Sequence, residues 1–172
     1  MSRPPFEPVT DDDLAKVAVQ LQRTPRDVVG VAARCRCGAP TVVATKPRLD
    51  DGTPFPTFYY LTHPAATAAM STLEAGQLMV EFTRMLETDP QIAAAYQAAH
   101  EGFLADREQF GDVDEIRGIS SGGMPSRVKC LHALAAHSLA AGPGVNPFGD
   151  LALEHSSWSP ERCECPEYGA AQ

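Results

Sequence analysis

With 172 residues, 44% of them hydrophobic and 21% charged, the chain has the composition of a soluble domain that buries a core without needing a metal or disulfide bonds to fold. The net charge of −8 argues against a nucleic-acid-binding protein, because such a protein presents a basic face to the phosphate backbone. No stretch is long and apolar enough to cross a bilayer, so we expect no membrane insertion and a cytoplasmic location, where five cysteines are more typical of thiols, metal ligands or redox groups than of structural disulfides.

The first predicted element is a helix that begins after Thr10. Thr10 can cap this helix together with Asp13, which lies at the capping-box position. Leu14 and Val17 then fall on one face at helical spacing. Pro25 ends the pattern, because a proline cannot continue a helix from within.

Three β-prone runs follow at residues 27–35, 40–49 and 56–63, each rich in β-branched or aromatic residues and bounded by glycine or proline. The letters CRCG form the turn between the first two runs. The pattern predicts a small antiparallel meander. The first run also fits a helix capped by Thr24 with Pro25 at its first position, and this alternative stays open.

The rest of the domain is predicted to be mainly helical. Helical runs cover residues 63–76, 77–89 and 89–110, a glycine-rich loop covers 111–126, and a last helix runs from about 125 to 141. We therefore expect a single α+β domain over residues 1–155, dominated by helices, with a short antiparallel β-meander near the N-terminus. Residues 156–172 are predicted to form a polar, mobile tail.

Thiols and imidazoles gather in one short stretch, VKCLHALAAH, where otherwise aliphatic sequence carries Cys130, His132 and His137. Two C-x-C motifs lie elsewhere, in RCRCG near the start of the chain and in RCEC near its end. The polar surroundings of RCEC favour a solvated tail over a second site. Cys37, Cys163 and Cys165 are secondary candidates.

Three long strings, VVGVAARCRCGAPTVV, PRLDDGTPFPTFYYLTHP and GGMPSRVKCLHALAAHSLAAGPGVNPFGD, resemble an uncharacterised bacterial family that is best represented in actinobacteria, domain of unknown function 501. The resemblance extends from the first helix to Asp150. It implies no activity, but it implies a shortlist of site residues: Cys35, His63, Cys130, His132 and His137. It also implies that some relatives carry cysteine in place of His63, an exchange that a zinc ligand tolerates and that packing does not explain.

A zinc ion needs four nitrogen or sulfur ligands at about 2.0–2.3 Å, arranged as a tetrahedron. Cys35 at the first turn, His63 at the end of the third strand and Cys130 near the start of the last helix offer three such ligands from three separate elements. The leading prediction is therefore a metal site, with zinc favoured, that ties the β-meander to the last helix. An iron–sulfur cluster with mixed ligands is not excluded by these residues.

The fourth ligand is either His132 or His137. His137 shares a helix face with Cys130 but lies about 10 Å further along the axis of a regular helix. His132 points away from Cys130 in a regular helix, and becomes the better partner only if the helix begins late, around Leu131. The sequence favours His132 slightly and leaves His137 open.

Other interpretations of the same residues stay open. A buried cysteine behaves as a small hydrophobic residue, so Cys130 also fits simple core packing. His137 on an alanine-rich helix also fits a hydrogen-bonded core histidine. Alternatively, Cys130 is a reactive thiol, because Arg127, Lys129 and a helix N-terminus all favour the nucleophilic thiolate, and a nearby histidine can serve as its base.

An anion is a second candidate ligand. Gly122 and Gly123 precede a predicted helix N-terminus that is followed by Arg127 and Lys129, an arrangement suited to phosphate. The alternative is that the glycines only provide conformational freedom for the turn before the helix. No acidic residue accompanies the cysteines and histidines at a metalloprotease-like spacing, so a non-catalytic role with an unidentified protein partner is a further hypothesis.

Overall fold

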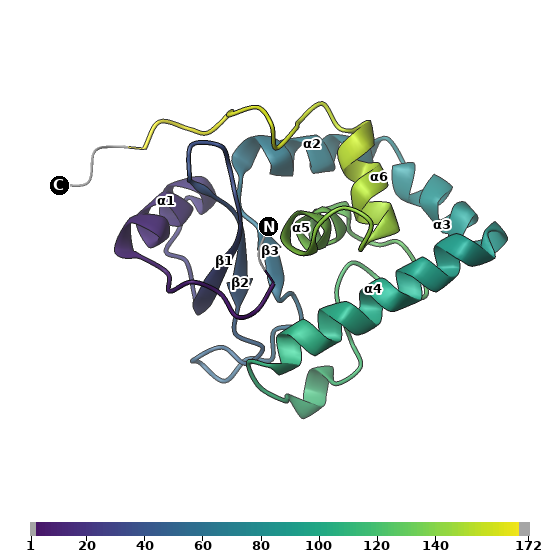
Figure 1. Cartoon of the computed structure of the whole chain (residues 1–172), viewed down its shortest axis with the longest axis horizontal. Helices are drawn as coiled ribbons and strands as arrows, with labels where there is room; N and C mark the ends of the chain where they lie inside the picture. The colour runs from purple at the N-terminus through teal and green to yellow at the C-terminus, as the bar shows by residue number, and fades with distance from the viewer. Residues whose placement is uncertain (1–2, 169–172) are drawn as a thin grey trace.

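The computed structural model describes residues 3–168, so the first two residues and the last four residues of the predicted tail lie outside it. The described elements, in chain order, are α1 (Asp11–Leu21), β1 (Val28–Arg34), β2 (Pro40–Thr45), β3 (Tyr59–Leu61), α2 (Pro64–Ala75), α3 (Leu78–Thr88), α4 (Pro90–Glu108), the 3-10 turn η1 (Asp114–Ile116), α5 (Leu131–Ala141) and α6 (Pro147–His155), as Figure 1 shows. The prediction of a helix-dominated α+β fold with an antiparallel meander near the N-terminus is confirmed.

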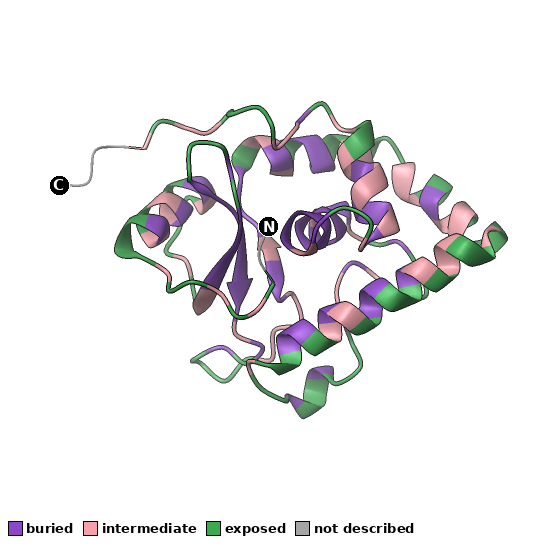
Figure 2. Cartoon of the chain, viewed as in Figure 1, coloured by how far each residue is buried: buried purple, intermediate pink, exposed green. Residues whose placement is uncertain are grey.

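The sheet is antiparallel in the order β1-β2-β3, with Val43 of β2 opposite both Val31 and Tyr60. Every residue of β2 is buried, since α1 contacts this strand from one side and α5 packs against all three strands (Figure 2). A strand covered on both faces is apolar without alternation, which explains the run PTVVAT. The alternative of a helix over residues 27–35 is wrong.

Helix α5 lies at the centre of the molecule, between the sheet, α2 and α6 (Figure 1). Nine of its eleven residues are buried, which accounts for its alanine-rich and almost entirely apolar sequence. The predicted start near residue 125 is wrong, because the helix begins at Leu131 and Cys130 is its N-cap in an extended conformation. The preceding residues are held outside the helix by the carbonyl of Gly122, which accepts a hydrogen bond from the Lys129 N–H at 2.8 Å.

After α6 the chain turns back and runs past α2 towards the turn between β1 and β2 (Figure 1). Trp158 is only 3% exposed, and its ring lies 5.4 Å from that of His63 at the start of α2. Further along, the Tyr168 hydroxyl accepts a hydrogen bond from the side chain of Gln20 in α1. The part of the predicted tail that the structure describes, residues 156–168, is therefore in contact with the domain at several points.

Among the described residues, none of the helices combines the length and the apolar character that crossing a membrane would require.

Candidate functional site

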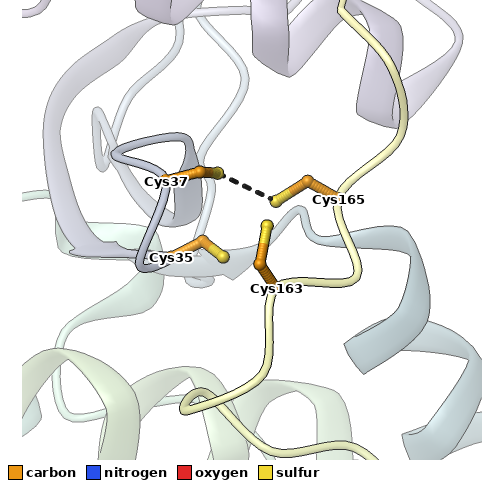
Figure 3. A group of neighbouring side chains, drawn as sticks. All are labelled: Cys35, Cys37, Cys163 and Cys165. Atoms are coloured by element: carbon orange, nitrogen blue, oxygen red, sulfur yellow. Dashed lines mark hydrogen bonds between the residues drawn. The ribbon is translucent and has the colours of Figure 1, made fainter.

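Four cysteine side chains converge between the turn that follows β1 and the C-terminal segment. Cys35 and Cys37 come from the turn, Cys163 and Cys165 come from the segment, and the four Sγ atoms all lie within 4.8 Å of one another (Figure 3). The turn is closed by two hydrogen bonds of 2.8 Å, from the Cys35 N–H to the Ala39 carbonyl and from the Gly38 N–H to the Cys35 carbonyl. In the extended C-terminal segment, alternate residues point to the same side, so C-x-C spacing suits the delivery of two thiols to one place.

The four sulfurs are not paired as disulfides. Cys37 Sγ lies 3.4 Å from Cys165 Sγ, whereas a disulfide bond is about 2.05 Å long. Tetrahedral thiolate ligands at about 2.3 Å from one metal ion lie about 3.8 Å from each other. The spacing of the four cysteines therefore suits a group that can hold a metal ion.

The local environments of these thiols differ. Burial raises the pKa of Cys35 and, more strongly, that of Cys165. Cys37 is exposed, and its hydrogen bond with the Ala39 N–H lowers its pKa to about 7. Four thiolates together would repel one another, so a bound cation is what makes the fully ionised group favourable.

His63 lies beside the four cysteines rather than among them. The ring is fully buried, and Nδ1 accepts a hydrogen bond from the Ala66 N–H at the start of α2, so the ring proton is on Nε2. That Nε2 lies 3.3 Å from Cys165 Sγ and donates towards it. Burial lowers the pKa of His63, which keeps the ring neutral. His63 therefore supports one of the sulfurs from outside the group.

A second group forms at the N-terminus of α5 from Cys130, His132 and Glu74 of α2. Glu74 Oε1 lies 3.0 Å from His132 Nδ1 and accepts the Leu131 N–H at 2.7 Å, so the carboxylate also caps the helix. Cys130 Sγ lies 4.0 Å from the same Nδ1. The late start of α5 at Leu131 is the condition under which the sequence favoured His132 over His137 as the partner of Cys130, and the structure fulfils it.

His132 is held in its charged form by these neighbours. Its hydrogen bond with Cys130 and then its contact with Glu74 raise the pKa of His132 to about 9. The second nitrogen, Nε2, lies 3.1 Å from the carbonyl oxygen of Thr67. As an imidazolium, the ring gives both of its N–H groups an acceptor, Glu74 on one side and Thr67 on the other.

We expect a histidine titration followed by NMR to place the pKa of His132 near 9, and a Glu74→Gln variant to lower it by about 1, because one opposite charge is removed. Since the folded pKa lies above the unfolded value, the charge of His132 stabilises the fold fully below about pH 6.5, and that contribution is lost as the pH rises through 9. His137 is the internal control, because its pKa, lowered by burial to about 4, should not respond to Glu74→Gln. An unchanged His132 titration in the variant would contradict the assigned contact.

His137 belongs to neither group. Its ring is fully buried, stacked on Tyr59 and edge-on to Phe103, and its Nδ1 accepts a hydrogen bond from the Asn146 side chain. The structure gives His137 the role of a core histidine, which was the alternative interpretation of the sequence.

A pocket of about 720 Å³ opens beside Cys130 and His132. Gly122 and Gly123 lie in its wall with positive φ of 71° and 93°, and a Cβ on Gly123 would lie 2.6 Å from the Arg127 carbonyl oxygen. The glycines are thus required by the turn that delivers Cys130 to the helix N-terminus. The side chains of Arg127 and Lys129 line the same pocket and are exposed.

The comparison with known families matches residues 31–154 to the family described as protein of unknown function (DUF501). The chain belongs to the DUF501 family. The comparisons with curated proteins and with solved structures each gave no match. The DUF501 region contains the pocket residues, Glu74, Cys130 and His132 as well as Cys35 and Cys37, whereas Cys163 and Cys165 follow it.

Within this DUF501 chain, the five predicted ligands do not form one group among the described residues. Cys35 joins the four cysteines, His63 lies beside them, Cys130 and His132 join Glu74, and His137 packs in the core. The sequence signal for the four-cysteine group was the repeated C-x-C motif, but the polar composition around the second copy favoured a solvated tail. Glu74 carried no signal, because it is 56 residues from Cys130 and shares no motif with it.

Proposed function

We propose that this DUF501 protein binds one zinc ion through Cys35, Cys37, Cys163 and Cys165, and that the ion fastens the C-terminal segment to the turn after β1. The observation that carries the proposal is the convergence of the four Sγ atoms within 4.8 Å. Four protein ligands leave no open position for a substrate, as is typical of structural rather than catalytic zinc.

Zinc is favoured over other occupants by ligand type and by spacing. Soft thiolates select zinc, copper(I) or iron–sulfur clusters rather than magnesium or calcium. A cluster places several iron and sulfide ions between the cysteines and so needs a wider cage than a single ion, whereas Cys37 and Cys165 approach to 3.4 Å. The N–H of His63 near Cys165 adds a hydrogen bond to one thiolate, as partners outside a metal's ligands commonly do.

A site of four reduced thiols also supports a reducing location. All five cysteines are free in the structure, and free thiols persist where glutathione and thioredoxin keep them reduced. We propose on this basis that the protein works in the cytoplasm.

Metal analysis of the full chain, purified under reducing conditions, tests the proposal. We expect one zinc per chain, lost in Cys163→Ser and in Cys165→Ser because three thiolates bind the ion far more weakly than four. Cys130→Ser is the matched control and should keep its zinc, since Cys130 lies in the other group. In the zinc-depleted variants, limited proteolysis should cut within residues 156–168 while leaving the domain intact.

Three results would count against the zinc site. A reduced protein that takes up no zinc has no such site. Loss of zinc in Cys130→Ser would show that the proposal assigns the metal to the wrong cysteines. Visible absorption together with stoichiometric iron would show that the four cysteines hold an iron–sulfur cluster and not zinc.

A further inference from the structure

The pocket beside α5 carries positive charge in a chain whose net charge is −8. Among its lining residues, Arg127 and Lys129 are cations and none is a carboxylate. Among the described residues, no ion pair within 4.0 Å engages either of these two side chains, and both are exposed. Two uncompensated cations on a wall without acidic groups create a local positive potential, which attracts anions.

The polar groups of the wall suit the same kind of ligand. Hydroxyl groups are contributed by Thr57, Tyr60, Thr67, Ser120, Ser121 and Ser126. Hydroxyls donate hydrogen bonds to phosphate or carboxylate oxygens, and the volume of about 720 Å³ is that of an ordinary small-molecule site.

Cys130 lies on the wall of this pocket together with His132. The imidazole is fixed on both sides, by Glu74 at Nδ1 and by the Thr67 carbonyl at Nε2. Cys130 Sγ is 4.0 Å from the same Nδ1 that faces Glu74. In this geometry the ring does not relay a proton from sulfur to carboxylate, but stands as a fixed imidazole beside the thiol, an arrangement that is typical of nucleophilic cysteine sites.

We infer that this pocket binds a small anionic compound bearing a phosphate or carboxylate group and presents Cys130 to it as a nucleophile. Arg127 and Lys129 hold the anion at the rim, and the sulfur of Cys130 displaces a leaving group from a carbon of the same molecule: a sulfur–carbon bond forms, the leaving group departs with the electron pair of the bond that breaks, and the thiol proton passes to solvent. The inference is independent of the zinc site, because none of the four clustered cysteines lines the pocket.

Alkylation of the intact protein by two reagents of different charge tests both halves of the inference. Iodoacetate is an anion and iodoacetamide is neutral; with either, the sulfur forms a bond to the methylene carbon and iodide leaves with the electron pair of the carbon–iodine bond. We expect Cys130, followed by peptide mass spectrometry at pH 7, to react about tenfold faster with iodoacetate than with iodoacetamide, because the local potential concentrates the anion.

Variants and competitors separate the roles of the charges and of the imidazole. The double variant Arg127→Gln, Lys129→Gln should lose the preference for iodoacetate while keeping its reaction with iodoacetamide, and His132→Gln should slow both reagents. Because Arg127 and Lys129 are exposed, the double variant is expected to fold normally, which circular dichroism checks. Protection of Cys130 by inorganic phosphate but not by malonate assigns a phosphate ligand, and the reverse assigns a carboxylate.

Other outcomes overturn the inference. Equal rates with the two reagents, unchanged in the double variant, mean that the pocket has no preference for anions. Lack of reaction at Cys130 with either reagent, in protein whose unfolded form is alkylated there, means that the thiol is not a nucleophile.

Discussion

An Arg107→Met variant is expected to lose about 3 kcal/mol of folding stability, because hydrogen bonds from a buried, charged donor to backbone carbonyls are lost. Arg107 in α4 is only 2% exposed, and its guanidinium donates to the carbonyl oxygens of Ile116 at 2.8 Å, of Ile119, and of Pro56 at 3.4 Å. Burial lowers the pKa of Arg107, but an arginine stays charged at every ordinary pH. Methionine keeps the aliphatic length but donates none of these hydrogen bonds; the carbonyls of Ile116 and Pro56 keep the N–H groups of Ile119 and Phe58, whereas the Ile119 carbonyl loses its charged donor.

The same substitution should disturb the pocket, because Pro56 and Ile119 belong to its wall. Through these hydrogen bonds, Arg107 joins the segment that precedes β3 to the loop that follows η1. We expect Arg107→Met to weaken the protection of Cys130 by phosphate or malonate as well as to shift urea unfolding to lower concentrations.

Arg117→Met is the matched control for this experiment. Arg117 is an exposed arginine of the same loop that pairs with Asp112 and Asp114 on the surface, so its loss should change stability by less than about 0.5 kcal/mol. Equal unfolding curves for the two variants would show that the buried guanidinium does not hold the loop.

Helix ends were predictable from the sequence wherever a neighbouring side chain determines them. Thr10 and Asp13 form the capping box that their spacing indicates, with the Asp13 N–H donating to Thr10 Oγ1 at 3.1 Å. Asp89 caps α4 and Pro90 is its first residue, which agrees with the start of the helical run predicted over residues 89–110. Both signals lie within one turn of the helix that they start, so no tertiary contact was needed to recognise them.

The C-terminal half was less predictable, for two different reasons. The start of α5 depends on the carbonyl of Gly122 and on Glu74, contacts that local sequence does not encode. Helix α6 was missed although a local signal exists, since Asn146 caps it and Pro147 is its first residue. Its short length and the polar residues after it hid this signal, so the last predicted helix was the one that ends near residue 141.

The candidate sites, like the helix ends, were predictable from the sequence only in part. The pairing of Cys130 with His132 was predictable, because the two residues lie within one turn of the same helix start. Their assembly was not, because Cys163 and Cys165 reach Cys35 only after the chain has passed α2, and Glu74 reaches His132 from another helix. Sequence patterns identify which side chains can do chemistry, whereas tertiary packing decides which of them meet.

The packing of α5 against α6 links the two candidate sites. Helix α5 carries Cys130 and His132 at its start, and α6 leads directly into the segment that bears Cys163 and Cys165. At the crossing of the helices Gly149 allows a close approach, because a Cβ there would overlap the Leu134 carbonyl and the Ser138 hydroxyl. Backbone atoms of a buried helix cannot move aside as a flexible side chain can.

Gly149→Ala is therefore expected to cost about 3 kcal/mol or more, since forcing an extra methyl group into a packed core moves the backbone. If α6 shifts away from α5, the segment that follows it is displaced too, so zinc content and the reactivity of Cys130 should fall together.

Gly76→Ala is the control: Gly76 has an ordinary φ of −77°, and its nearest neighbours would lie 3.5 Å from a new Cβ. That variant should match or slightly exceed the wild type in stability, because alanine restricts the unfolded chain. Urea unfolding, metal analysis and alkylation of both variants decide the matter, and a Gly149→Ala protein with unchanged stability would show that α6 accommodates the methyl group without leaving α5.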